Sequence, residues 1–211
     1  QMPALNRFIS GQRIYARNDI QCMMAVKKGL SIESEETVIK AFFMPDDTVE
    51  TIFNKFQTLI NETKQSEANN VESTAKFLMH LPRFLLKFAV WFLGLMDYFG
   101  ILPKKLLDIS PFHGSFFITS MGSLGIPVIY HHLYDFGNCP AFCCYGAKYY
   151  KTETDEKGEK SKHKCMDMTF VLDERICDGL YYATALKKML KYIKEPELLD
   201  TEKINVIEDV D

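Results

Sequence analysis

The pattern of apolar and polar positions changes period several times along the chain, and each change predicts a new element. Runs rich in apolar, β-branched and aromatic residues, separated by turn residues, predict strands. They fall within residues 1–30 (two strands and a turn) and at 36–43, 113–120, 128–133, 141–150 and 165–172. Between the last two runs, residues 152–164 are charged and carry no apolar side chain, so we expect a solvated hairpin loop there.

Two segments have the apolar period of a helix. In the first, Asp47 is the expected N-cap, Glu50 completes a capping box, and apolar positions recur through about residue 63. In the second, Asp178 stands where an N-cap belongs and Pro196 ends the helix. We expect the apolar face of the second helix to be buried; it consists of Tyr182, Leu186, Met189, Leu190 and Ile193. Residues 64–74 are polar, which predicts a loop or a helix end.

The most apolar stretch is residues 75–99, within which residues 88–96 carry no charge. A transmembrane helix needs about 20 apolar residues, so this stretch is too short to span a membrane. We expect one or two core helices, with Pro82 near a first turn. Two alternatives stay open: a helix lying on a membrane surface, and an interface with another chain.

The order of these elements predicts an α+β protein. Strands and helices share the first half, consecutive strands follow, and a helix comes last, which favours a mostly antiparallel or mixed β-sheet covered by helices. No internal linker or repeat divides residues 1–211, so we expect a single domain with an acidic, frayed tail at 197–211.

Composition narrows the classes of function. The formal net charge is −3 without a dominant basic stripe, so no nucleic-acid partner is expected. No signal peptide precedes the first strand, which favours a cytoplasmic protein, and the abrupt start leaves open whether the chain is full length. The six cysteines are then expected to be reduced core thiols. Disulfides, or a metal site at Cys139 and Cys143, are the alternatives, but no second ligand pair follows at zinc-finger spacing, so no metal is expected.

Three blocks, in chain order, resemble one known family. Residues 113–126 read H-G-S-F-F-I-T-S-M-G-S-L-G-I, which is similar to the G-T-F-T-I-S-N-L-G-x-x-G-I segment of dihydrolipoamide acyltransferases, the catalytic cores of 2-oxoacid dehydrogenase complexes. Residues 173–179 read D-E-R-I-C-D-G and resemble the family's D-H-R-x-x-D-G signature, and residues 3–6 resemble its P-x-L-N block. The family's strand and helix before P-x-L-N, and its lipoyl and peripheral-subunit-binding segments, have no counterpart in this sequence.

The resemblance implies the fold that this family shares with chloramphenicol acetyltransferase. It also implies CoA-dependent acyl transfer from an acyl-CoA or acyl-thioester donor, no covalently bound cofactor, and a homotrimer with active sites between subunits. In the family, the signature histidine is the general base, and a Ser or Thr in the glycine-rich strand stabilises the tetrahedral oxyanion. The oxyanion position matches Thr119 or Ser120, of which we favour Ser120, and the signature aspartate, which organises the site, is Asp178. Folding explains Asp178 and Gly179 equally well, as a helix cap and a tight turn.

The position of the catalytic histidine is occupied by Glu174. A neutral imidazole, with an ordinary pKa of about 6.5, suits proton removal at neutral pH. An ordinary glutamate carboxylate lies roughly four pKa units below a thiol, so the proton transfer costs roughly 5–6 kcal/mol unless burial strengthens the carboxylate as a base. Glu174 is therefore predicted to be a poor base.

Other side chains are candidates for the missing base. His131 and His132 are adjacent on a predicted strand, so one could face a cavity; the alternative is one histidine bonded within the sheet and one at the surface. His113, at the start of the motif strand, is similarly ambiguous. Cys177 lies in the signature turn without an assignable histidine partner, so a cysteine nucleophile is not favoured.

Two hypotheses follow for the function. In the first, the chain is an acyltransferase-like enzyme with Glu174, Asp178 and Ser120 in its site, and its activity is altered or lost through Glu174. In the second, it is a non-catalytic binding or assembly module of the same fold, which forms a trimer or pairs with a catalytic paralogue or a lipoyl protein. Fold alone does not separate them.

Overall fold

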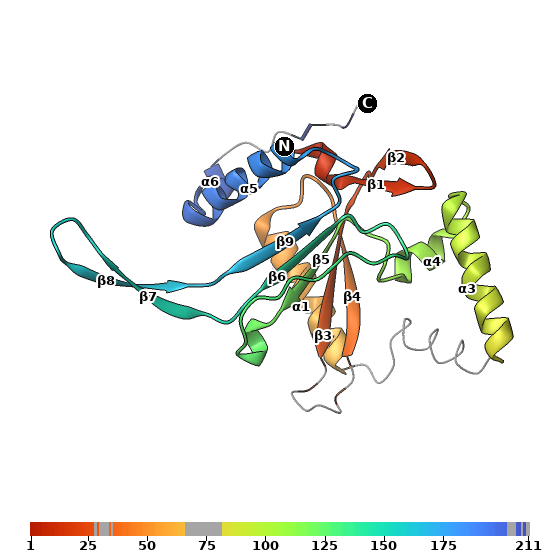
Figure 1. Ribbon diagram of the computed structural model, residues 1–211, viewed down its shortest axis with the longest axis horizontal. Coiled ribbons are helices and arrows are strands. Elements are labelled where there is room, and N and C mark those ends of the chain that lie inside the picture. The colour runs from red at the N-terminus through yellow and green to blue at the C-terminus, as the bar shows by residue number, and fades with distance from the viewer. Residues whose placement is uncertain are drawn as a thin grey trace.

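Figure 1 shows the computed structural model of the chain, which describes residues 1–27, 29, 34, 36–65, 82–201, 206, 207 and 209. A central sheet carries helices on its flanks, with a projecting hairpin at one end of the long axis and helix α3 at the other. The polar loop expected at 64–74 lies outside the described residues from residue 66 onward, as does the start of the apolar stretch at 75–99.

The central sheet has five strands in the order β4-β3-β5-β6-β9. They are β3 (Ile20–Lys27), β4 (Glu36–Phe43), β5 (Phe116–Ser120), β6 (Ala141–Tyr145) and β9 (Met168–Leu172). Strand β5 runs parallel to both β3 and β6, whereas the edge pairs β3–β4 and β6–β9 are antiparallel. The prediction of a mixed sheet is therefore confirmed.

Two antiparallel ribbons stand apart from this sheet. After the 3-10 turn η1 (Pro3–Asn6), β1 (Arg7–Ser10) pairs with β2 (Arg13–Ala16) across a turn at Gly11, whose φ of 59° favours glycine. With β3, residues 1–27 thus hold three strands instead of the two predicted. The first two pair only with each other, and the third belongs to the central sheet. The second ribbon joins β7 (Tyr149–Thr154) to β8 (Lys160–Cys165). Its side chains are exposed except at Cys165, which confirms that the hairpin predicted at 152–164 is solvated. The segment is not the predicted loop, however, because residues 152–154 and 160–164 pair as strands.

The strand predicted at 128–133 is wrong. After the 3-10 turn η2 (Gly122–Leu124), the chain forms no strand until β6. Parallel strands need a crossover connection, and this segment provides it between β5 and β6. Its backbone groups form hydrogen bonds that do not belong to a strand pair. For example, the carbonyl of Ile129 accepts from the hydroxyl of Thr169 at 2.7 Å. Leu133 packs on the sheet, so the apolar run covers the core instead of extending it.

Buried side chains alternate between the two faces of the sheet. One face is covered by α1 (Val49–Gln65), and its cluster contains Cys22, Ala41 and Phe43 with Ile52, Phe56 and Leu59 of the helix. The other face is covered by the crossover, and its cluster contains Met23, Phe117 and Phe142 with Leu133 and Cys139. Both faces are therefore occupied. All six cysteines are free thiols, and the described residues contain no group of potential metal ligands.

Helix α1 begins one residue later than predicted. The backbone N–H of Thr51 donates to the hydroxyl of Thr48 at 3.2 Å, so Thr48 supplies the cap in place of Asp47. The carboxylate of Asp47 instead accepts from the N–H of Met44 at 2.9 Å and pairs with Lys55 at 2.6 Å. The carboxylate of Asp47 is therefore engaged by the turn before the helix and by a side chain of its second turn, and the N–H groups of the first turn are left to Thr48.

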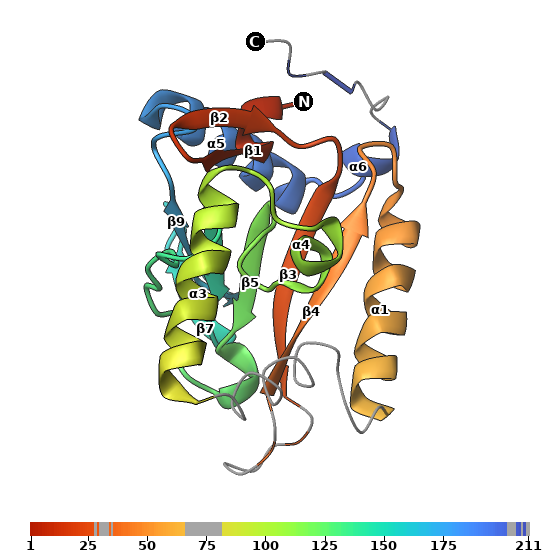
Figure 2. The same cartoon turned by 90° about the vertical axis from the view of Figure 1, so that its right-hand side faces the viewer.

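Helix α3 (Arg83–Tyr98) has no buried residue, so the prediction of a core helix at this stretch is wrong. Pro82 precedes its first turn as expected, and the short helix α4 (Lys104–Ile109) follows. Figure 2 shows α3 standing in front of the sheet, while α1 lies at its side. Since α1 and the crossover already cover the sheet, α3 has no core surface left to cover. No helix among the described residues is long and apolar enough to cross a membrane.

Helix α5 (Gly179–Lys194) runs past the N-terminal segment and is followed by the short α6 (Leu198–Thr201). Of its predicted buried stripe, only Tyr182 is buried, and Leu190 and Ile193 are about half exposed, because the far half of the helix extends beyond the core. In the tail predicted to be frayed, Asp209 forms an ion pair with Arg7 at 2.5 Å, while residues 202–205, 208, 210 and 211 lie outside the described residues.

Candidate active site

The signature turn at 173–179 connects β9 to α5 and is held by its own polar groups. Asp178 caps α5, since its carboxylate accepts from the N–H of Tyr181 at 2.8 Å, which confirms the predicted cap. Arg175 donates to both carboxylate oxygens of Asp173, from Nε at 2.8 Å and from a terminal nitrogen at 2.6 Å, and this hydrogen bonding lowers the pKa of Asp173. The hydroxyl of Tyr182 donates to the carbonyl of Asp173 at 2.5 Å and anchors the turn to the buried side of α5.

Glu174 projects from this turn into solvent. It is exposed and has no hydrogen-bond or ion-pair partner among the described residues. Its Oε1 lies 3.9 Å from where a Cβ on Gly179 would stand, so the carboxylate is next to the first residue of α5. No described residue buries the Glu174 carboxylate.

Ser120 lies at the opposite end of the sheet from this turn. It pairs with Tyr145 of β6, which in turn pairs with Met168, the first residue of β9. Glu174 follows Leu172, the last residue of β9, so at least four strand residues, or about 13 Å, separate the two ends. The structure thus brings Glu174 and Asp178 together and keeps Ser120 apart. Thr119, the other oxyanion candidate, is buried on the face of the sheet opposite to that of Ser120.

The histidine candidates take different places. His131 stacks on Phe142 with ring centroids 4.2 Å apart, and its Nδ1 lies 2.7 Å from the carbonyl of His132, which is exposed. Both lie on the crossover and not on the predicted strand. His113 is 2% exposed, with Nδ1 2.7 Å from the hydroxyl of Ser110 and Nε2 3.1 Å from Oδ1 of Asp97. None of the three lies on the signature turn, and Cys177 is a half-buried thiol there whose pKa is raised by burial.

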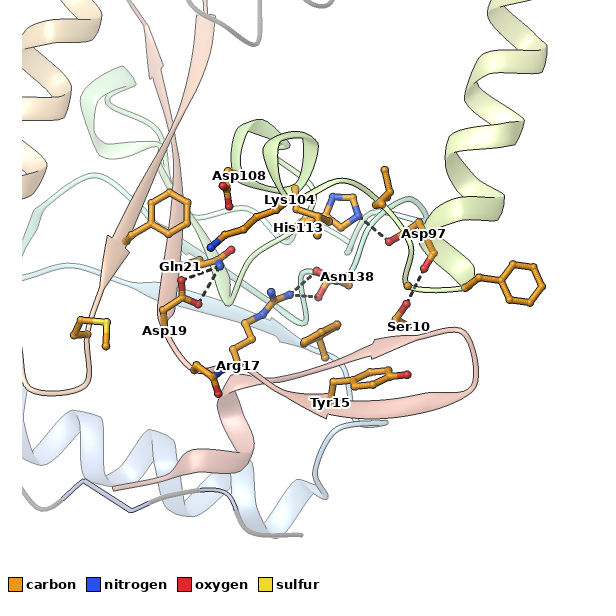
Figure 3. Close-up of a pocket in the computed structure, with 18 residues that line it drawn as sticks. Ser10, Tyr15, Arg17, Asp19, Gln21, Asp97, Lys104, Asp108, His113 and Asn138 are labelled. Carbon is orange, nitrogen blue, oxygen red and sulfur yellow. Dashed lines mark hydrogen bonds and ion pairs between the residues drawn. The ribbon is translucent and has the colours of Figure 1, made fainter.

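A cleft of about 860 Å³ lies between the β1–β2 ribbon and the region where α3 leads into α4 (Figure 3). The guanidinium of Arg17 lies in it, 4.1 Å from the ring centroid of Phe8, and donates to Oδ1 of Asn138 at 2.5 Å. Its Nε is buried and has no hydrogen-bond partner among the described residues, and burial lowers the pKa of Arg17 to about 10. Asp19 on the same wall bonds to Gln21. The cleft therefore holds a buried cation that lacks a direct carboxylate partner.

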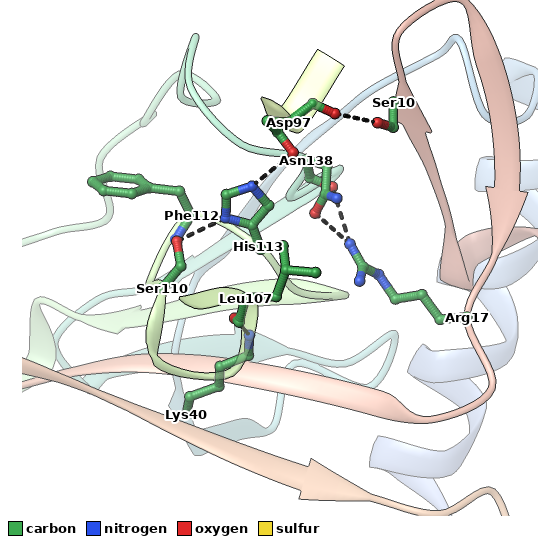
Figure 4. Close-up of polar contacts among 9 residues, drawn as sticks. All are labelled: Ser10, Arg17, Lys40, Asp97, Leu107, Ser110, Phe112, His113 and Asn138. Atoms are coloured by element: carbon green, nitrogen blue, oxygen red, sulfur yellow. Dashed lines mark hydrogen bonds and ion pairs between the residues drawn. The ribbon is translucent and has the colours of Figure 1, made fainter. Parts of the chain in front are cut away.

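Asp97, His113 and Ser110 form a hydrogen-bonded row beside the cleft (Figure 4). The carboxylate of Asp97 accepts, so Nε2 of His113 is the donor to it, and the hydroxyl of Ser110, which accepts from the N–H of Phe112 at 3.3 Å, can donate to Nδ1. A catalytic row would present the serine to the substrate. Here Asp97 and His113 line the cleft and Ser110 does not, so the row joins the end of α3 to the start of β5 and offers no nucleophile.

Sequence reasoning missed Arg17 and Asp97, which line this cleft, and Lys40, which bonds to the carbonyl of the lining residue Leu107. One signal was present: Asp97 is the single acidic residue in the apolar run that became α3. A lone carboxylate in such a run indicates a specific partner, which proved to be His113. Arg17 had no comparable signal, since its partner Asn138 is more than 100 residues away.

Lys40 makes the stability of this region depend on pH. Its ammonium donates to the carbonyl of Leu107 at 2.7 Å, and burial, then repulsion from Arg17, lowers the pKa of Lys40 to about 8. Between that value and the ordinary lysine pKa of about 10.4, the unfolded chain holds a proton that the folded chain has released. The free energy of unfolding therefore increases as pH rises through this window. Below it, the folded protein bears the full cost of burying the charged ammonium of Lys40.

We expect the substitution Lys40→Met to remove this gain. The free energy of unfolding of the variant minus that of wild type should be highest near pH 7 and should fall progressively toward pH 10.5. Urea unfolding at a series of pH values measures this difference. Lys105→Met, at an exposed site on α4, is the matched control and should give a profile parallel to wild type. A parallel profile for Lys40→Met itself would contradict the lowered pKa.

Comparison with known proteins assigns the fold. No family model and no curated protein sequence matches the chain. Solved structures do match, and they make this an acyltransferase-like fold. A probable dihydrolipoamide acetyltransferase from Listeria monocytogenes 4b F2365 aligns with a TM-score of 0.57 and 14% identity over 92% of this chain and 63% of that one. The resemblance seen at residues 113–126 and 173–179 is thus confirmed at the level of the fold.

Two further solved structures have lower scores. A dihydrolipoamide acetyltransferase from Azotobacter vinelandii gives a TM-score of 0.49 and 11% identity over 94% of this chain and 64% of that one. The cubic core of the pyruvate dehydrogenase multienzyme complex gives 0.47 and 11% over 94% and 64%. The chain therefore spans slightly less than two thirds of the length of the proteins it matches.

Proposed function

We propose that this chain is a CoA-dependent acyltransferase-like protein of the chloramphenicol-acetyltransferase-like type, with Glu174 in the position of the general base. The observation that carries the proposal is the turn at 173–179, which has the family's signature order and lies between the last sheet strand and its following helix. Acyl-CoA would be a cosubstrate and not a resident cofactor. The acceptor would be a thiol or hydroxyl group.

The separation of Ser120 from Glu174 supports a site that forms between copies of the chain. An oxyanion donor acts only within hydrogen-bond distance of the reacting carbonyl, and about 13 Å of strand prevents this within one chain. In a homotrimer, the Ser120 end of one copy could meet the Glu174 turn of the next. Both halves of the site would then come from different subunits.

The exposed carboxylate of Glu174 favours an altered or lost activity. General-base catalysis needs a group whose proton affinity matches the task, and the histidine of the resembled signature is replaced by a glutamate at this position. The same observation supports a second candidate, a non-catalytic binding or assembly module of this fold. Such a module would pair with a catalytic paralogue or a lipoyl protein.

The test combines assembly, binding and turnover of the full chain. We expect analytical ultracentrifugation to give a trimer, calorimetry to detect CoA binding, and acetyl transfer from acetyl-CoA to dihydrolipoamide to be slow or absent. A monomer at all concentrations would refute the shared site. If the protein neither binds CoA nor transfers acetyl groups, the acyltransferase proposal is refuted and the non-catalytic assembly module remains.

A further inference from the structure

Helix α3 carries a row of large apolar side chains that faces away from the protein. We call it the α3 stripe: Phe84, Leu85, Phe88, Trp91, Phe92 and Leu95, which are 72%, 41%, 60%, 60%, 46% and 38% exposed. At 100° per residue these positions cover about a third of the helix circumference. A continuous exposed apolar patch of this size marks a surface that binds something.

The stripe is a property of the surface and not a poorly covered core. The ring of Phe88 lies 5.8 Å from that of Trp91 and 6.1 Å from that of Phe92, so these rings contact one another. The opposite side of α3 faces the protein and is partly buried, at Leu86, Ala89, Leu93 and Met96. In Figure 1 α3 is the outermost described element on its side of the molecule, and in Figure 2 it stands in front of the sheet.

Two cations line one edge of the stripe. Arg83 and Lys87 lie one helical turn apart, and neither has an ion-pair partner among the described residues. The single carboxylate of α3, Asp97, is already bonded to His113. A second copy of the helix would therefore cover the stripe without supplying an anion to either cation. A surface that combines an apolar layer with negative charge would satisfy both.

We propose that α3 binds the surface of a membrane that contains anionic lipids. The helix has 16 residues and is thus about 24 Å long, less than the hydrocarbon thickness, so it lies in the plane of the interface. The α3 stripe enters the boundary of the acyl chains, and Arg83 and Lys87 contact headgroup phosphates. This binding does not depend on the proposed acyl transfer, and neither does its test.

Trp91 makes the proposal directly measurable, because it is the only tryptophan of the chain and belongs to the stripe. The chain of residues 1–211 is mixed with phosphatidylcholine vesicles that contain about 30% phosphatidylserine, or none. We expect a blue shift of tryptophan emission, quenching by lipids brominated on their acyl chains, and flotation with the anionic vesicles. Binding to neutral vesicles should be weaker, and added salt should weaken binding to the anionic ones.

Substitutions separate the apolar contribution from the electrostatic one. Phe84→Ser with Phe88→Ser should abolish flotation, whereas Leu180→Ser, at a 77% exposed site on α5, should leave it unchanged. Circular dichroism of each variant establishes that it is folded.

The cations are tested in the same assay. Arg83→Gln with Lys87→Gln should weaken binding by about five-fold per charge. Lys157→Gln with Lys160→Gln, on the hairpin at the far end of the molecule, removes the same charge and should have no effect.

Three results would overturn the proposal. The first is an absence of vesicle binding at low salt. The second is Trp91 emission that is already blue-shifted without lipid and returns to that of an exposed tryptophan on dilution, which would assign the α3 stripe to a second copy. The third is a blue-shifted emission that neither lipid nor dilution changes, which would mean that the chain itself covers the helix.

Discussion

Replacement of Glu174 by histidine is expected to raise acetyl transfer from acetyl-CoA to dihydrolipoamide by about 100-fold or more, the lower end of what a positioned general base contributes. The turn can accept an imidazole, since Glu174 is exposed and has no partner among the described residues to lose. Asp178 and Gly179, which shape the start of α5, are untouched. Turnover is measured as kcat/KM by release of CoA.

The pH dependence identifies the cause of such a gain. With an imidazole as the base, the rate should rise through pH of about 6.5, the ordinary value for histidine. Glu174→Gln is the matched control, because it removes the carboxylate without adding a base, and it should remain as inactive as wild type. Equal activity of wild type and Glu174→His would mean that the carboxylate already serves as the base. Inactivity of both, with CoA still bound, would favour the binding module.

The second large effect concerns the sheet core. Phe117 is 3% exposed and stacks on Phe142 with ring centroids 4.9 Å apart at an angle of 7°. Phe117→Ala removes this ring between β5 and the crossover and is expected to lower the free energy of unfolding by about 3–5 kcal/mol. Urea unfolding followed by far-UV circular dichroism, at one protein concentration for all variants, measures the change.

Phe84→Ala is the control for this experiment. It deletes the same ring at a site that is 72% exposed on α3, and the expected change is within about 0.5 kcal/mol in lipid-free buffer. The contrast between the two phenylalanines tests which apolar segment is core. A loss at Phe84 comparable to that at Phe117 would contradict the exposed position of α3.

Local signals in the sequence were sufficient for several elements. The strand at 36–43 was predicted to the residue, because β-branched and aromatic residues cluster there between polar neighbours. The start of α5 was predicted at Asp178, since a cap depends on a side chain and an N–H only three residues apart. The cap of α1 was displaced to Thr48 because Asp47 bonds to Lys55, eight residues along the chain.

Apolar runs, in contrast, were ambiguous. The run at 128–133 and the stretch that became α3 have compositions that fit a strand and a core helix, respectively. The first became a crossover because β5 and β6 are parallel, and the second was left uncovered because both faces of the sheet were occupied. The hydrophobicity of a segment indicates that its burial is favourable. Whether a core surface is free to bury it depends on elements far away in the chain.

The same distinction applies to the candidate site. The sequence by itself determined the signature turn, its glutamate and its helix cap, because all of these depend on residues within one short segment. Only the tertiary structure decided that Ser120 lies at the other end of the sheet, since that depends on β5 and β9 running in opposite directions through their shared neighbour β6. It likewise decided that Arg17 meets Asn138, and that Asp97 meets His113, in a cleft. Contacts between distant segments follow from strand direction and register, which no local pattern of residues encodes.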